Sequence, residues 1–135
     1  MDGIMSDSLF IELPIRPESA RWAREALAEF RDHLDEASFI DLQLMVSELV
    51  SDAVRAEAED EQHEIAIRIE ARDELIHVEV REGEIAYRLR SRRPEPGERG
   101  FGLYLIRILA DRWGTRHEGE RGCVWLQMPM AAAQG

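Results

Sequence analysis

Residues 39–56 read Phe39-Ile40-Asp41-Leu42-Gln43-Leu44-Met45-Val46-Ser47-Glu48-Leu49-Val50-Ser51-Asp52-Ala53-Val54-Arg55-Ala56. Within this stretch the apolar residues recur at helical spacing, at Leu42, Met45, Val46, Leu49, Val50 and Ala53. This spacing predicts an amphipathic helix whose apolar stripe faces a core. The rest of the fold is therefore expected to pack around this helix.

An acidic flank borders the stripe. Glu48 and Asp52 are four residues apart, and Asp41 and Glu59 continue the same line. Like charges at this spacing weaken an isolated helix by about 0.3 kcal/mol per pair, so they call for an explanation. One explanation is a solvated acidic face partnered by Arg55. The other is a cleft in which these carboxylates hold a cation or accept a proton.

The pattern on either side alternates between strands and helices. Residues 9–13 alternate like a strand, and residues 20–34 carry a second apolar helical stripe, with Ser38 as a candidate cap for the central helix. Residues 65–70 and 76–81 alternate with period two around Arg72-Asp73-Glu74, which predicts a hairpin. A third helix is expected over residues 103–112, and two further strands near residues 114–118 and 122–130.

This order of elements predicts the fold class. Strands joined by hairpins form a largely antiparallel sheet, and three amphipathic helices cover one face of such a sheet. The expectation is an α+β fold, a two-layer sandwich with a mostly antiparallel mixed sheet under three helices. With 135 residues and 44% apolar content, we expect a single domain over residues 1–135, with a core from about 9 to 129 and loose termini.

Composition excludes several classes of function. A net charge of −11 argues against nucleic acid and against an anionic membrane surface as partners. All 17 basic residues are arginine, which excludes a P-loop, a kinase with a strand lysine, and Schiff-base chemistry on lysine. Cys123 is the only cysteine, and we find neither a signal peptide nor a long apolar run. A cytoplasmic protein is therefore expected.

Three motifs in order carry a family resemblance. They are residues 44–55, the strand that leads into Arg81-Glu82-Gly83, and Gly100-Phe101-Gly102-Leu103-Tyr104-Leu105-Ile106. Together they resemble the histidine-kinase-like (GHKL) ATPase superfamily, and specifically its bacterial anti-sigma-factor serine kinase branch. The resemblance extends from about residue 9 to residue 129. It implies ATP and Mg²⁺ as cofactors.

The resemblance also implies roles on the phosphate side of a nucleotide site. Glu48 matches the family's general base, and Asp52 stands where the family has a magnesium-binding asparagine. Gly100 and Gly102 match glycines whose backbone lies against the phosphates. Physical chemistry agrees with the last role, because glycine allows close approach and a helix start attracts anions.

On the adenine side, the resemblance aligns Glu82 with an aspartate that receives the adenine amino group, next to Gly83. Cys123 falls where the family often has a threonine near the adenine. The usual motif there is aspartate, any residue, glycine, any residue, glycine, whereas this chain reads Glu82-Gly83-Glu84-Ile85-Ala86. The arginine-rich residues 87–99 correspond to the family's lid over the nucleotide.

These departures leave three interpretations. In the first, the protein is a partner-switching regulator that binds a sigma factor or an anti-sigma-factor antagonist, with weakened or lost ATP handling. In the second, it is an active ATP- and magnesium-dependent serine kinase that phosphorylates such an antagonist, with Glu48 as base. In the third, it is a dimerising scaffold of the same fold. The family often pairs as a homodimer, so a homodimer is implied as well.

Overall fold

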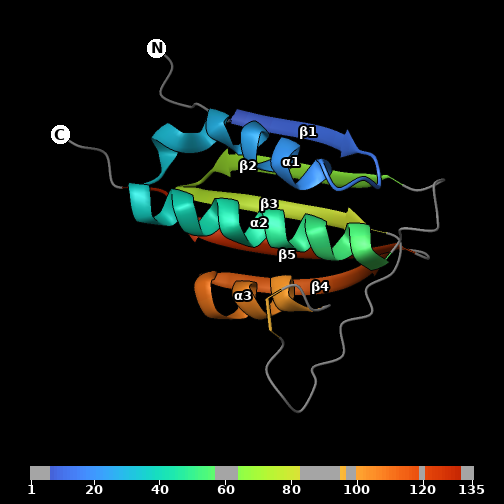
Figure 1. The fold of residues 1–135 in the computed structure, drawn as a ribbon. Coiled ribbons are helices and arrows are strands. Elements are labelled where there is room, and N and C mark those ends of the chain that lie inside the picture. The colour runs from blue at the N-terminus through green and yellow to red at the C-terminus, as the bar shows by residue number, and fades with distance from the viewer. Residues whose placement is uncertain (1–6, 57–63, 83–94, 97–99, 119–120, 132–135) are drawn as a thin grey trace.

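Five strands and three α-helices form two layers in the computed structural model (Figure 1), which describes residues 7–56, 64–82, 95–96, 100–118 and 121–131. The strands are β1 (Asp7–Leu13), β2 (Ile65–Arg72), β3 (Leu75–Glu82), β4 (Arg112–Glu118) and β5 (Arg121–Pro129). They lie in the order β1-β2-β3-β5-β4, and each neighbouring pair is antiparallel. The predicted α+β sandwich is confirmed, and the described pairings include no parallel one.

The helices all lie on one face of the sheet (Figure 1). They are α1 (Ser19–Leu27), which continues as a 3₁₀ turn η1 (Ala28–His33), α2 (Glu36–Ala56) and α3 (Phe101–Leu109). The long helix α2 packs against α1 on one side and α3 on the other. The predicted central role of residues 39–56 is confirmed, because α2 contacts both of the other helices. Among the described residues, no helix has the length and apolar content that a membrane span requires.

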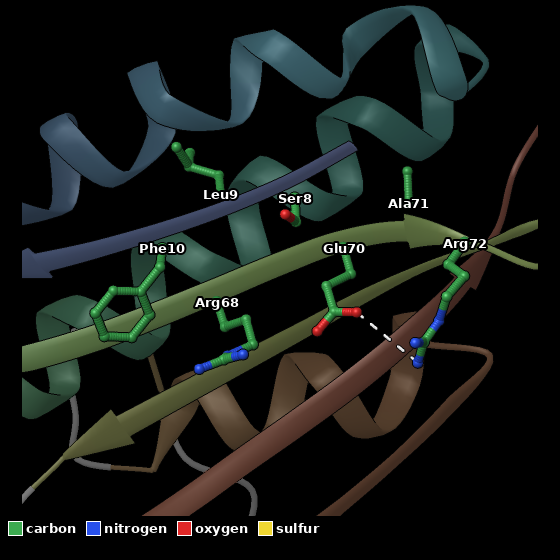
Figure 2. Close-up of a pocket in the computed structure, with 7 residues that line it drawn as sticks. All are labelled: Ser8, Leu9, Phe10, Arg68, Glu70, Ala71 and Arg72. Atoms are coloured by element: carbon green, nitrogen blue, oxygen red, sulfur yellow. Dashed lines mark ion pairs between the residues drawn. The ribbon is translucent and has the colours of Figure 1, made fainter. Parts of the chain in front are cut away.

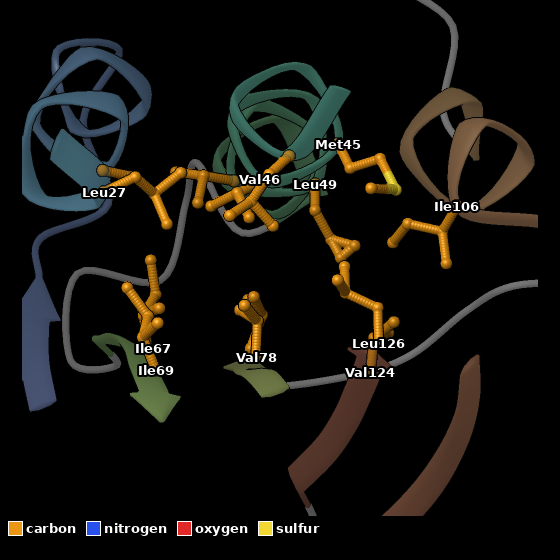
Figure 3. Packing of buried hydrophobic residues seen from close by; sticks show 14 of the residues in the cluster. Leu27, Met45, Val46, Leu49, Ile67, Ile69, Val78, Ile106, Val124 and Leu126 are labelled. Carbon is orange, nitrogen blue, oxygen red and sulfur yellow. The ribbon is translucent and has the colours of Figure 1, made fainter. Parts of the chain in front are cut away.

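The core fills the space between the two layers (Figure 3). Leu49 of α2 is fully buried and points toward Val124 and Leu126 of β5, while Met45 meets Ile106 of α3. The alternation of β2 and β3 brings Ile67, Ile69, Val78 and Val80 to this same face. Period-two strands thus supply one wall of the core, and the helical stripe of α2 supplies the other.

Several helix boundaries differ from the sequence prediction, and the first α-helix, expected over residues 20–34, ends at Leu27 and gives way to the 3₁₀ turn η1. The helix α2 starts at Glu36, and the carboxylate of Asp35, rather than Ser38, acts as its cap by accepting the Ser38 backbone N–H at 2.8 Å. This hydrogen bond, joined by one from the Ser38 hydroxyl, lowers the pKa of Asp35. The helix α3 stops at Leu109 because Ala110 is already extended (φ −79°, ψ 147°) and leads directly into β4.

The β2–β3 hairpin turns on two residues that are both in the left-handed region, Asp73 (φ 54°) and Glu74 (φ 66°). Such a turn favours Asn-Gly or Asp-Gly, since glycine adopts positive φ without steric cost. We therefore expect Glu74→Gly to stabilise the protein by about 0.5–1 kcal/mol in urea denaturation. Glu74→Ala is the control, because it keeps the strained φ. An equal gain from both variants would contradict this explanation.

The face of the sheet opposite the helices carries an ionic network. The carboxylate of Glu79 on β3 accepts hydrogen bonds from Arg116 of β4 at 2.8 Å and from His77 at 2.9 Å. Trp125 of β5 stacks on His77 and lies across Gly114, where an added Cβ would come within 2.7 Å of the indole. Polar contacts therefore connect the strands on this face, and the sequence analysis did not predict them.

The network predicts a pH-dependent contribution to stability. Burial raises the pKa of Glu79, but the hydrogen bonds from His77 and Arg116 and the charge of Arg116 outweigh it, so the pKa lies below its usual value. A lowered pKa in the folded state stabilises the protein above the unfolded pKa of about 4.3, and this contribution is lost as pH falls through the folded pKa.

We expect Glu79→Gln to cost about 0.5–1 kcal/mol near pH 7, because the group is partly solvated, and progressively less below about pH 4. Urea denaturation of both proteins across this range measures the difference. Glu70→Gln serves as the control, since Glu70 makes only a 3.8 Å contact with the exposed Arg72. A difference that stays constant with pH would contradict the assignment.

Candidate functional site

Asp52 and Glu48 of α2 lie beside the start of α3. The side chain of Asp52 is only 2% exposed. Its Oδ2 accepts the backbone N–H of Gly100 at 3.1 Å and that of Gly102 at 3.0 Å. This contact joins Asp52 to two glycines that lie 48 and 50 positions further along the sequence. Of the predicted site residues, the structure brings Asp52, Gly100 and Gly102 directly together.

The start of α3 requires such a partner from outside the helix. The first N–H groups of a helix have no intrahelical acceptor and are usually satisfied by a capping side chain. Here the capping position is Gly100, which has no side chain and adopts φ 94°. Because the helix cannot cap itself, the Asp52 carboxylate of α2 supplies both the acceptor and a negative charge at the positive end of α3.

Arg55 completes the contact from the same helix. Its Nη2 donates to Oδ1 of Asp52 at 2.7 Å, and its side chain is 40% exposed. The carboxylate therefore accepts three hydrogen bonds, one of them from a cation, so that its charge is neutralised at the site. The sequence analysis named Arg55 as a partner for the acidic face and placed Asp52 and the two glycines in one nucleotide site, but it did not predict hydrogen bonds between them. A glycine at a helix start opposite an unexplained acidic residue is the signal that could have found them.

Gly102 has a packing role that involves no ligand. An added Cβ at this position would lie 2.8 Å from the backbone nitrogen of Leu49 and 2.9 Å from its Cα. Real Cβ atoms do not come this close to backbone, so a larger residue forces α3 away from α2. The close approach that the sequence attributes to a phosphate is, in this structure, an approach of one helix to another.

Glu48 lies one turn before Asp52 on α2. Its side chain is half-buried, and its backbone carbonyl carbon lies 3.0 Å from where a Cβ of Gly102 would be. Within the described part of the chain, its carboxylate forms no hydrogen bond or ion pair with another residue. It is thus placed beside the start of α3, and its role as general base stays a prediction.

The adenine-side residues divide between the two faces of the sheet. Glu82 is 3% exposed and shares the helix-facing side of β3 with Val78 and Val80. Cys123 is fully buried, but it alternates with Val124 and therefore belongs to the opposite face, paired with Arg81 and Arg116. Gly83 lies outside the described residues, as do residues 87–94 and 97–99 of the predicted lid. The nucleotide roles of all three stay predictions.

The residues around Asp52 do not fit ATP and Mg²⁺ as they are arranged. The two amides that would face a phosphate already donate to a carboxylate, and that carboxylate is the expected magnesium ligand. In the described residues there is no group of three or more His, Cys, Asp or Glu side chains arranged to hold a metal ion. In this arrangement the two amides are not available to a phosphate.

A pocket of about 290 Å³ opens elsewhere, on β1 and β2. Figure 2 shows Phe10, Arg68, Glu70 and Arg72 on one side of these strands, with Leu9 and Ala71 turned to the other. The guanidinium of Arg68 lies 5.5 Å from the centre of the Phe10 ring, and Arg72 pairs with Glu70 at 3.8 Å. Its lining residues all belong to β1 and β2, so the pocket is not part of the contact between α2 and α3.

The chain is similar to a known family and to solved structures. Residues 13–128 match the family model described as the histidine kinase-like ATPase domain. A similar solved structure is that of the RsbU and RsbW domains of Rv1364c from Mycobacterium tuberculosis, with a TM-score of 0.69 and 19% sequence identity. The match covers 92% of this chain and 32% of that one, so the chain spans about a third of its length. No curated protein matches the sequence.

Proposed function

Since the chain belongs to the histidine kinase-like ATPase domain family, we propose that it is a partner-switching regulator that binds a sigma factor or an anti-sigma-factor antagonist. In this proposal the signal is carried by the exchange of protein partners. Phosphoryl transfer from ATP is not required. The domain acts as a protein-binding module, and one of its own side chains blocks the phosphate side of the nucleotide site.

The contact between Asp52 and the start of α3 carries this proposal. A nucleotide-dependent member of the family needs free N–H groups at the helix start to receive phosphates. In this chain Gly100 and Gly102 donate those N–H groups to Asp52, which is 2% exposed. The buried carboxylate also places a negative charge where phosphates would come, and like charges repel.

The partner class rests on the sequence resemblance, which implies an anti-sigma role. The similar solved structure contains an RsbW domain. At 19% identity the likeness itself establishes the fold alone. The binding of a sigma factor or an antagonist is thus our proposal for this chain.

Exposed apolar side chains on the helix layer support a protein partner. Ile40 is 55% exposed and Leu44 40% exposed, one turn apart on α2, and Ile108 on α3 is 56% exposed. Ile40 and Leu44 are neighbours on the surface of α2, and exposed apolar side chains that lie together are typical of sites where another protein binds. A partner that covers them would remove them from water.

The test combines nucleotide and partner titrations. Calorimetry of the purified protein with ATP and Mg²⁺ is expected to show no saturable binding up to millimolar concentration. Sigma factors and antagonist proteins from the source genome are then titrated with and without ATP and Mg²⁺, and one is expected to bind equally well in both conditions. Micromolar ATP binding, or partner binding that requires ATP, would refute the proposal.

A further inference from the structure

We propose that Asp52 is the residue that excludes phosphates from this protein, because its carboxylate occupies the anion site formed by Arg55 and the start of α3. This inference deepens the proposed function and rests on it for its biological meaning. The donors of the anion site are all present, and the Asp52 carboxylate fills it.

Three donors from two helices converge on the carboxylate. The N–H groups of Gly100 and Gly102 lie 3.1 and 3.0 Å from Oδ2, and Nη2 of Arg55 lies 2.7 Å from Oδ1. Two backbone amides at a helix start together with a guanidinium are the groups that proteins use to hold phosphate oxygens. In the structure the carboxylate of Asp52 stands in for that phosphate.

An incoming phosphate faces two obstacles while Asp52 is charged. It has to replace all three hydrogen bonds of a carboxylate that is 2% exposed, and it has to approach the displaced negative charge on the neighbouring helix. The carboxylate belongs to the same chain as the site, so its effective concentration there is high and a free phosphate competes poorly with it. Exclusion therefore follows from a single residue and not from the shape of the site.

Asparagine at this position removes the charge and weakens the competing hydrogen bonds, with little change in shape. The amide is neutral, and it offers one acceptor oxygen where the carboxylate offers two. If that oxygen faces the glycine amides, its NH₂ group faces the guanidinium of Arg55, which is also a donor. The Asn side chain thus holds the site less tightly and leaves Arg55 available to an anion.

The experiment measures binding of inorganic pyrophosphate, which tests the anion site without the adenine side. We expect no binding to the wild-type protein at millimolar pyrophosphate, and saturable binding to Asp52→Asn that is tighter by about tenfold or more. Calorimetry gives the affinity. In ¹H–¹⁵N NMR spectra, the Gly100 and Gly102 amide resonances should shift with pyrophosphate in this variant only.

Two further variants make the result specific. Asp41→Asn makes the same charge change on α2, and no described residue bonds to the Asp41 side chain; it should behave like the wild type. Asp52→Asn/Arg55→Gln should lose the gained affinity, because the guanidinium is part of the site. A thermal melt shows that each variant is folded.

The outcomes separate this inference from the proposed function. If neither the wild type nor a folded Asp52→Asn binds pyrophosphate, the inference is wrong while nucleotide-independent partner binding stands. The same holds if Asp41→Asn gains affinity equally, since net charge would then explain the effect. If the wild type itself binds both pyrophosphate and ATP tightly, the inference and the proposed function both fail.

Discussion

Gly102→Ala is expected to lower the free energy of unfolding by about 3 kcal/mol, because its Cβ has nowhere to go. The nearest atoms are the backbone nitrogen and Cα of Leu49 at 2.8 and 2.9 Å, and backbone in the middle of α2 cannot move aside cheaply. The helix α3 must therefore shift away and weaken its contact with Met45 and Leu49. Urea denaturation followed by circular dichroism measures the loss.

Gly100→Ala is the matched control for this prediction. A Cβ at Gly100 meets nothing within 4 Å, so only its φ of 94° opposes the substitution. This strain costs about 1 kcal/mol. The two variants differ in steric contact and share the loss of a glycine near the same helix start. Equal destabilisation would show that the close approach of α2 and α3 does not determine the cost.

Asp52→Ala is expected to destabilise the protein by about 2–4 kcal/mol, because it leaves donors without an acceptor. The amides of Gly100 and Gly102 both lose their partner, and the Gly102 amide is buried. Unlike Asp52→Asn, alanine keeps no acceptor at all, so its cost should be the larger of the two. Chemical denaturation at neutral pH gives both values.

Asp41→Ala provides the comparison, because it removes an acidic side chain from the same helix without removing an acceptor from α3. It should cost less than about 0.5 kcal/mol. Arg55→Ala should fall between the two, at about 0.5–1 kcal/mol, since its side chain is 40% exposed and water can replace it. If Asp52→Ala were no worse than Arg55→Ala, the cap on α3 would contribute little to stability.

These contacts hold α2 and the start of α3 together. Gly102 allows the two helices to touch, and Asp52 satisfies the amides that their contact buries. In a nucleotide-binding site a ligand would complete this corner of the fold. Here the chain completes it with its own carboxylate, which is why the same residue affects both stability and ligand choice.

Much of the fold could be predicted from periodicity. The stripe of α2 and the alternation of β2 and β3 each place apolar residues on one face, and burial of that face is the main driving force of folding. The boundaries were less accurate. A cap at Asp35 in place of Ser38, and the early end of α3, depend on individual backbone angles that periodicity does not specify.

Three of the predicted site residues lie in contact, while the roles predicted for them stay predictions. The resemblance singled out Asp52, Gly100 and Gly102 together, and the structure joins them by hydrogen bonds. It associated Cys123 with the adenine side, yet the strand register places that side chain on the face opposite the helices. The network around Glu79 was missed because it joins three strands whose order, with β5 between β3 and β4, is not visible in the sequence.

The sequence by itself determined the α+β class, the central helix and the acidic residue that stands near two glycines in a family pattern. Only the tertiary structure decided what that acidic residue does. Whether Asp52 faces a metal ion, water or another part of the chain depends on how closely α3 packs on α2, and that distance is set by contacts between residues about 50 positions apart. The N–H groups of a helix start need acceptors and favour a negative charge, and in this fold the Asp52 carboxylate supplies both.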